Sequence, residues 1–392
     1  MASRRRRPPR VALLVETTRT YTRELLAGVR RYVAAHGPWS CFIELRALES
    51  GPPPWLKNWD GDGIITRTFT QEMADVIAAT GLPAVELRAT FLKSAFPFVG
   101  MDNRLIGQMV AEHFFDRGYQ SFAVYSLHTE RFFVERVQNF VAAVQARGGA
   151  CSILPEPVSD RAADWEKGQA RLISWLTSLP KPVGIFAAND QLGVRVLDAC
   201  QRAGIAVPED VAVVGAENEE TLCAFVNPPL TSVRFDGAAV GFAAAELLAR
   251  MMCGGAPPKG ETLFPPKGIV VRGSSDEFVI TDRLVAHAAR VIRENATTGL
   301  NVDDLCRKLN ASRSTLDRRM RAALGRTPKE EILHVRFREV ERLLRETDLT
   351  IEAIAEQTGF AYSHYLQAAF KQVHGLTPGE FRRRSQAYST LT

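Results

Sequence analysis

The chain has 392 residues, 46% hydrophobic content and a net charge of +5, enough for packed cores and for more than one domain. Residues 281–392 carry the whole excess of +5, whereas residues 1–280 are balanced. No apolar run approaches the roughly 20 residues that cross a bilayer, and the six cysteines lack any pairing or metal-ligand spacing. We therefore expect a cytoplasmic protein with buried thiols, without metal, cofactor or membrane partner.

The first 280 residues alternate short apolar runs with helical patterns after a basic start that we expect to be a disordered tail, residues 1–10. This alternation is typical of parallel sheets with crossover helices. The predicted strands are 11–15, 64–65, 84–87, 98–101, 122–125, 185–187 and 211–214, and the predicted helices are 21–35, 103–117 and 191–203.

Polar residues follow several of these strands directly. Ligands of open parallel sheets bind at the carboxyl ends of the strands, so these residues are candidate ligand contacts. Amides, carboxylates and an aromatic ring suit a polyhydroxylated ligand, because each hydroxyl both donates and accepts. Helix capping is an equally good explanation for Asp190, and the better one for Asp102-Asn103. The candidates are Glu16, Arg19, Tyr21, Asn189, Asp190, Glu217 and Asn218.

Residues 302–332 and 351–381 repeat one helix, turn, helix pattern. The offset is 49 residues at first and 50 from Phe370 onward, so the second copy has one extra residue in its turn or early second helix. Ser312 is placed to cap the second helix of the first copy, and Gly325 to end it. The apolar positions Val302, Leu305, Leu309, Leu316 and Met320 correspond to Ile351, Ile354, Thr358, Tyr365 and Phe370.

The second helix of the first copy has a polar, cationic face opposite its apolar stripe. A helix-turn-helix places such a face in the major groove of DNA, where arginine binds guanine. Any helical hairpin also has a solvated charged face, but two copies on a basic segment favour DNA binding. The face consists of Arg313, Ser314, Asp317, Arg318 and Arg321.

Residues 281–385, with the two units and their LGRTP and HGLTP closings, resemble the DNA-binding domain of AraC/XylS transcription regulators. The resemblance implies two recognition helices entering successive major-groove faces, and RNA polymerase is a further candidate partner. Ala368 stands where members of that family often carry a long polar side chain, so we expect the second unit to read fewer bases. The matching residues of the second unit are Ser363, His364 and Gln367.

The runs IFAANDQLGVRVLDAC and VPEDVAVVG resemble the effector-binding domain of LacI/GalR regulators over residues 11–273. In that family the matching polar residues bind sugar, which points to Asn189, Asp190, Glu217 and Arg136 here. Glu217 departs from the usual aspartate and has a longer reach. Arg88 stands where a polar or acidic contact is common, which suits either an acidic sugar or a salt bridge.

Together these parts resemble the xylose operon regulator family. The resemblance implies a homodimer that binds double-stranded DNA, regulates transcription in response to a sugar and is expected to activate it. The implied fold is an α/β sensor of two lobes, each a doubly wound parallel sheet, followed by an all-α double helix-turn-helix domain. A DNA-tethered hydrolase using Asp190 and Glu217 and a constitutive DNA binder with an empty sensor remain alternatives. The expected segments are a sensor at 11–273 (lobes 11–126 with 236–260, and 127–235 with 261–273), a linker at 274–280, the DNA module at 281–385 and a tail at 386–392.

Overall fold

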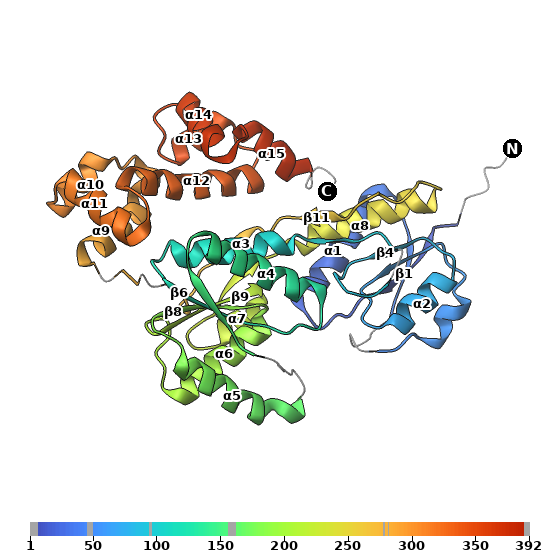
Figure 1. Ribbon diagram of the computed structural model, residues 1–392. Coiled ribbons are helices and arrows are strands. Elements are labelled where there is room, and N and C mark those ends of the chain that lie inside the picture. Colours follow the sequence, from blue (N-terminus) through green and yellow to red (C-terminus); the bar gives the residue numbers. More distant parts are fainter. Residues whose placement is uncertain are drawn as a thin grey trace.

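The computed structural model describes residues 7–44, 50–93, 96–155, 162–276, 279–280 and 282–387. Two α/β lobes lie side by side, and a helical domain lies beside the second lobe on the face that carries α3 (Asn103–Phe115) (Figure 1). Within these ranges, no helix is both long and apolar enough to span a membrane. The expected fold class, an α/β sensor followed by an all-α domain, is confirmed.

The first lobe is a parallel sheet with strand order β2-β1-β3-β4. Helices α1 (Thr20–His36) and α8 (Gly237–Met252) pack against each other on it so closely that a Cβ on Gly241 would lie 1.9 Å from the Leu25 carbonyl oxygen. Glycine is therefore required at that crossing. The remaining elements are β1 (Arg10–Leu14), β2 (Ser40–Ile43), β3 (Gly63–Thr66), β4 (Ala84–Glu86), a 3-10 helix (Pro54–Asn58) and α2 (Gln71–Ala79).

The second lobe is a six-stranded sheet with order β12-β10-β9-β8-β6-β7, in which only β12 is antiparallel to its neighbour. Its central strands are buried on both faces, which explains their continuous apolar sequence. Its elements are β6 (Ser121–Tyr125), α4 (Arg131–Ala146), β7 (Ala150–Ile153), a 3-10 helix (Ala162–Asp164), α5 (Trp165–Ser178), β8 (Val183–Ala187), α6 (Asp190–Ala203), β9 (Val211–Glu217), α7 (Glu220–Phe225), β10 (Thr231–Arg234) and β12 (Gly268–Val270).

The expected division of the lobes near residue 126 is wrong. Strand β6 pairs with β7 and β8, and α3 packs on α4, so the chain enters the second lobe just before Asn103. Similarly, β11 (Thr262–Phe264) pairs with β5 (Val99–Met101) and not with the second sheet. The apolar pattern identifies strands but not which strand they pair with, because pairing depends on residues distant in sequence.

The expected linker at 274–280 is also partly wrong. Ser274 and Ser275 are fully buried, and the Ser274 hydroxyl donates to the Val213 carbonyl and accepts from the Thr231 amide. These two serines are therefore an integral part of the second lobe. Small polar side chains are typical of linkers. Here their hydroxyls make hydrogen bonds with buried backbone groups of the sheet.

The helical domain consists of two units joined by α12 (Pro328–Glu346). Ile332 of α12 packs into the first unit, whereas Phe337 and Val340 pack into the second, so one helix completes both cores. A capping box of Thr327 and Glu330 begins that helix. The other helices are α9 (Arg283–Asn295), a 3-10 turn (Ala296–Thr298), α10 (Val302–Leu309), α11 (Arg313–Leu324), α13 (Ile351–Gln357), α14 (Ser363–His374) and α15 (Pro378–Ala387).

The extra residue of the second copy lies in its turn, which corrects the assignment of Tyr365. Leu366 is the buried counterpart of Leu316, and Tyr365 is 61% exposed. The prediction that all cysteines are buried is also wrong, because Cys41 and Cys253 are exposed.

Candidate functional site

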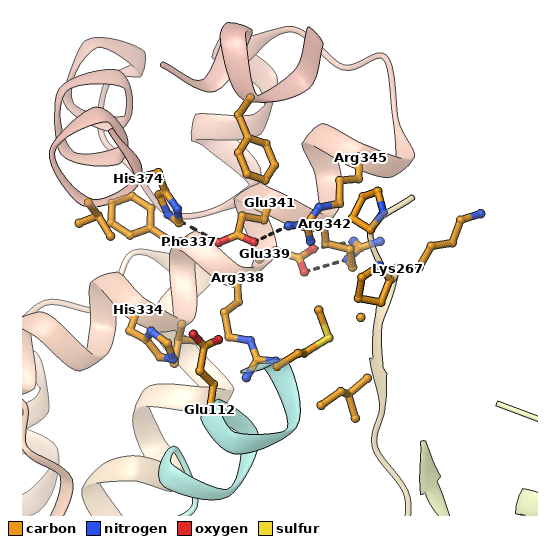
Figure 2. A pocket seen from close by; sticks show the side chains of 18 of the residues that line it. Glu112, Lys267, His334, Phe337, Arg338, Glu339, Glu341, Arg342, Arg345 and His374 are labelled. Carbon is orange, nitrogen blue, oxygen red and sulfur yellow. Dashed lines mark hydrogen bonds and ion pairs between the residues drawn. The ribbon is translucent and has the colours of Figure 1, made fainter. Parts of the chain in front are cut away.

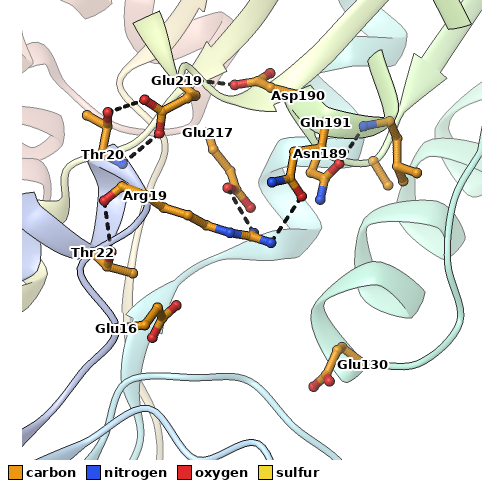
Figure 3. A network of polar contacts seen from close by, with 12 residues as sticks. Glu16, Arg19, Thr20, Thr22, Glu130, Asn189, Asp190, Gln191, Glu217 and Glu219 are labelled. Atoms are coloured by element: carbon orange, nitrogen blue, oxygen red, sulfur yellow. Dashed lines mark hydrogen bonds and ion pairs between the residues drawn. The ribbon is translucent and has the colours of Figure 1, made fainter. Parts of the chain in front are cut away.

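The ends of several strands bring charged side chains together between the two lobes (Figure 3). Glu16 follows β1, Arg88 follows shortly after β4, and Glu217 ends β9. Arg67 directly follows β3 and is coupled electrostatically to Glu217 and Arg88. Carboxyl ends of parallel strands from both lobes therefore meet at one polar site, as the sheet rule predicts.

Glu217 connects the two lobes. Its Oε2 lies 3.5 Å from Arg19 Nη1 of the first lobe, and its Oε1 lies 3.7 Å from Arg136 Nη1 of the second. The backbone of Glu217 has a φ of 107°, a conformation that is costly for a residue with a side chain. The surrounding structure therefore holds this carboxylate in place, as is common at binding sites.

Arg136 is the most heavily engaged cation of the site. Its Nε donates to Asn103 Oδ1 at 3.0 Å and its Nη1 donates to the Ala188 carbonyl at 2.7 Å. The guanidinium also lies over the rings of Phe132 and Phe235, at 4.9 and 5.1 Å from their centres. Packing and hydrogen bonds fix this side chain in one orientation, as a recognition residue requires.

Glu16 and Arg67 form a buried ion pair that sequence reasoning missed in part, because Arg67 was not a candidate. Glu16 Oε2 and Arg67 Nε are buried and have no hydrogen-bond partner among the described residues. Buried polar atoms in that state are costly, so they mark a place where a ligand could bind. The signal was present, since Arg67 follows a predicted strand just as Glu16 does.

Arg88 is 6% exposed and lies 3.3 Å from Glu130 of the second lobe. Its guanidinium also packs over Phe69 and Phe132. The sequence left an acidic sugar and a salt bridge open for this residue, and the salt bridge is present.

Asn189, Asp190 and Asn218 bind the protein itself. Asn189 caps α6 by accepting from the Leu192 amide. Asp190 accepts from the Ser232 hydroxyl at 2.5 Å and the Glu219 amide at 2.7 Å, and burial raises its pKa to about 7. The Asn218 side chain accepts from Arg272. Asp190 and Asn218 therefore brace the loop that follows Glu217, and Asn189 fixes the start of α6. Tyr21 packs edge-on against Phe235 beside Arg136.

A second contact between the lobes involves Glu219, which the sequence did not single out. Its Oε2 accepts from the Thr20 amide at 2.6 Å, and its Oε1 accepts from the Thr20 hydroxyl. Arg23 lies 3.7 Å away. A carboxylate at the first turn of α1 is favourable because it satisfies an otherwise unpaired helix amide.

Glu86 is a buried acid below the site. Its Oε1 accepts from the amides of Thr68, Leu87 and Arg88 at 3.0, 3.1 and 2.9 Å. Burial raises the pKa of this carboxyl to about 7, although these hydrogen bonds and Arg67 oppose the shift. The carboxyl therefore keeps its proton to a higher pH than an exposed glutamate does.

We expect Glu86→Gln to flatten the pH dependence of stability. The folded chain binds a proton at Glu86 up to about pH 7, whereas the unfolded chain releases it near its ordinary pKa of 4.5. The contribution of Glu86 to the free energy of unfolding is thus complete below its pKa in the unfolded chain. It is lost as the pH rises through its pKa in the folded chain. Glutamine keeps the accepting oxygen. Between these two pKa values, the free energy of unfolding of the wild type, measured with urea, should fall relative to that of the variant by up to about 1.4 kcal/mol per pH unit. Parallel pH profiles would contradict the assignment.

The candidate DNA-contacting side chains lie on α11 and α14, the second helices of the two units. Asp317 and Ser363 are half-buried, and the others are exposed: Arg313, Ser314, Arg318, Arg321, His364 and Gln367. Tyr362 and Tyr365 are also largely exposed and flank His364, whose ring stacks on that of Tyr362. Sequence reasoning missed these rings, because Tyr365 was assigned to the apolar stripe.

Comparison with known proteins agrees with this arrangement. Residues 111–275 match a periplasmic binding protein-like domain, and residues 305–384 match a helix-turn-helix domain. The xylose operon regulatory proteins of Haemophilus influenzae and Escherichia coli K12 are each 29% identical to the chain over 95% of its length, covering 98% and 96% of those proteins. A solved structure of the xylose-binding transcription activator XylR is 28% identical, with a TM-score of 0.63 over 96% of this chain and 98% of that one.

The chain thus combines a sensor domain and a helix-turn-helix domain, and over nearly its whole length it is similar to the xylose operon regulators. It is therefore a transcription regulator with a sensor and a DNA-binding helix-turn-helix domain, as the sequence resemblance implied. A CelR–cellobiose complex, at 21% identity and a TM-score of 0.56, shares the sensor fold over 68% of the chain.

Proposed function

We propose that this regulator binds a neutral pentose, xylose or a close relative, between the two lobes and activates transcription in response. The observation that carries this proposal is the position of Glu217 between Arg19 and Arg136, which come from different lobes. A carboxylate and guanidinium groups provide the acceptors and donors that sugar hydroxyls need. The xylose-binding activator to which the chain is similar supports the choice of sugar and the sign.

In this proposal Glu16, Arg19, Arg67, Arg136 and Glu217 contact the hydroxyls. The unpartnered atoms of Glu16 and Arg67 support that role. Tyr21 and Phe235 supply ring surface beside Arg136. Asn189, Asp190 and Asn218 support the site from behind. We favour a neutral sugar over an acidic one because the charge of Arg88 is already balanced by Glu130.

We infer that the regulator acts as a homodimer on double-stranded DNA in the cytoplasm. Each helix-turn-helix unit covers a short site, so two copies would supply the binding area and specificity that an operator requires. Activation suggests a contact with RNA polymerase, which we place among the partners of the DNA-bound form.

We infer that the chain is not an enzyme. A paired-carboxylate hydrolase would use Asp190 and Glu217, but both oxygens of Asp190 accept hydrogen bonds from the protein. Glu217 faces Arg19 and Arg136, so its two oxygens are each engaged in an ion pair with the protein.

The test is thermal unfolding of the full chain with xylose, arabinose, ribose, glucose and xylonate, followed by chromatography of each sugar after incubation. A sugar that binds the native state raises the melting temperature. We expect xylose or a close pentose to stabilise most and to be recovered unchanged. Stabilisation by xylonate alone would contradict the neutral ligand, and turnover of a sugar would contradict a pure regulator.

A further inference from the structure

Helix α3 connects the candidate sugar site with the DNA-binding domain. Asn103, its first residue, accepts from Arg136 at 3.0 Å. Asp116, its C-cap residue, contacts the DNA-binding domain. A helix of 13 residues is about 20 Å long, so one rigid element has an end at each site.

Asp116 is 8% exposed and binds two arginines and one histidine of the DNA-binding domain. Arg326 Nη2 donates to Oδ1 at 2.7 Å, and Arg338 Nη1 donates to Oδ2 at 3.0 Å. His334 Nε2 lies 2.9 Å from the same Oδ2. Glu331 also accepts from Arg326, at 2.7 Å, which orients that guanidinium.

The Asp116 carboxylate is charged at neutral pH. Burial alone would favour the neutral acid, but the hydrogen bond and charge of His334 and the charges of Arg338 and Arg326 hold its pKa well below the usual range. Removing one member of a buried ion cluster leaves the others unpaired, which is strongly unfavourable. The contact is therefore specific for an acid at this position.

The three side chains that bind Asp116 lie just after the first recognition helix or on the helix that follows it. Arg326 follows Gly325, the residue that ends α11, and His334 and Arg338 lie on α12, which completes both cores. Figure 2 shows His334 and Arg338 reaching from α12 toward Glu112 on α3, across a groove of about 1300 Å³ between the two domains. Arg326, His334 and Arg338, the three partners of Asp116, line this groove.

The chain segment that joins the domains is fastened to the same end of α3. Arg117 Nε donates to the Ser275 carbonyl at 2.7 Å, and the Val279 amide donates to the Arg117 carbonyl at 2.9 Å. Arg293 of α9 is paired with Asp276 at 3.0 Å. The DNA-binding domain is thus attached to α3 both through the joining segment and through Asp116. Rotation of the domain about the joining segment would require loss of the Asp116 contacts.

We propose that Asp116 is the positioning residue through which the sensor sets the orientation of the DNA-binding domain, with α3 as the connecting element. The coupling part of this proposal rests on the proposed sugar response. A ligand that competes for Arg136 alters the contact at Asn103, and the position of α3 then changes how well Arg326, His334 and Arg338 fit Asp116. The sugar thus favours one domain orientation only by its differential affinity for it.

The test compares Asp116→Asn with Asp198→Asn in the full chain. Asp198 is an acid of the same lobe that pairs with Arg202 of its own helix, α6, so its variant controls for loss of an ion pair. Asp116→Asn should change the small-angle scattering profile toward a more extended, mobile molecule, whereas Asp198→Asn should keep the wild-type profile. Xylose affinity should be unchanged in Asp198→Asn, and in Asp116→Asn it should change by no more than the factor by which sugar and domain orientation are coupled. Asp116→Glu should restore part of the wild-type profile.

DNA binding provides the second readout, with the best duplex selected from a random library as probe. Allosteric coupling typically changes affinity by roughly 5- to 150-fold, and Asp116→Asn should reduce the effect of xylose to about onefold. If that variant does not fold, Arg338→Gln, which removes the most exposed of the three partners, should show an intermediate loss. A wild-type profile or wild-type coupling in the folded variant overturns the proposal. If xylose leaves wild-type DNA binding unchanged, the proposed sugar response fails, and the scattering comparison still decides the role of Asp116.

Discussion

Replacing Arg136 by methionine should abolish the response to sugar and destabilise the sensor. The change leaves Asn103 Oδ1 and the Ala188 carbonyl without their donor and Glu217 without its nearest cation in the second lobe. Methionine keeps the apolar stem between Phe132 and Phe235, so the loss concerns charge and hydrogen bonds more than volume. Breaking a buried ion pair from one side costs about 3–5 kcal/mol.

Urea unfolding and xylose titration measure the two effects of Arg136→Met separately. Because about 1.4 kcal/mol corresponds to a tenfold change in affinity, loss of two charge-assisted contacts should weaken xylose binding by at least about 100-fold. Arg131→Met on the same helix is the matched control, since Arg131 is more exposed and pairs with Glu135 and Glu261. Equal effects of the two substitutions would show that Arg136 has no special role at the site.

Much of the sensor could be predicted because its information is local. Buried parallel strands are continuous apolar runs, and the polar residues after them mark one edge of the sheet. This reasoning located Glu16 and Glu217, and the resemblance to LacI/GalR regulators added Arg136; the structure brings these three residues to one site. It also suggested Asn189 and Asp190, whose side chains cap a helix and brace a loop. The position of a polar residue after a strand does not show whether its side chain binds a ligand or another part of the protein.

The features that escaped prediction depend on distant partners. The pairing of Arg67 with Glu16 links strand ends 51 residues apart. The burial of Ser275 depends on His113 and Thr231, neither of which is near it in sequence. Nothing in the sequence near Asp116 distinguishes it from any other residue at the end of a helix, because its partners belong to the DNA-binding domain. Contacts between domains leave no periodic signal, so the coupling elements of a regulator are the hardest to infer from its sequence.

The two recognition helices differ in the chemistry they present. On α11, Arg313 and Arg318 are exposed cations, whereas α14 presents Ala368 at the position equivalent to Arg318 and the rings of Tyr362 and Tyr365 nearby. Arginine recognises guanine through two parallel hydrogen bonds, and apolar surface contacts the thymine methyl group. We therefore expect the first unit to select guanine at fixed positions and the second to contribute weaker, more tolerant contacts.

Arg318→Ala tests this assignment with the largest effect expected on DNA binding. If Arg318 reads a guanine, the selected duplex should bind about 5- to 150-fold more weakly, the equivalent of about 1–3 kcal/mol, and preference should relax at one base pair only. Arg342→Ala is the control, because Arg342 is already paired with Glu339 and Glu346 on α12. Binding should be measured on the selected duplex and on its single-base variants over a range of salt. Uniform weakening on all duplexes, with a salt slope shallower by about one, would instead make Arg318 a phosphate contact.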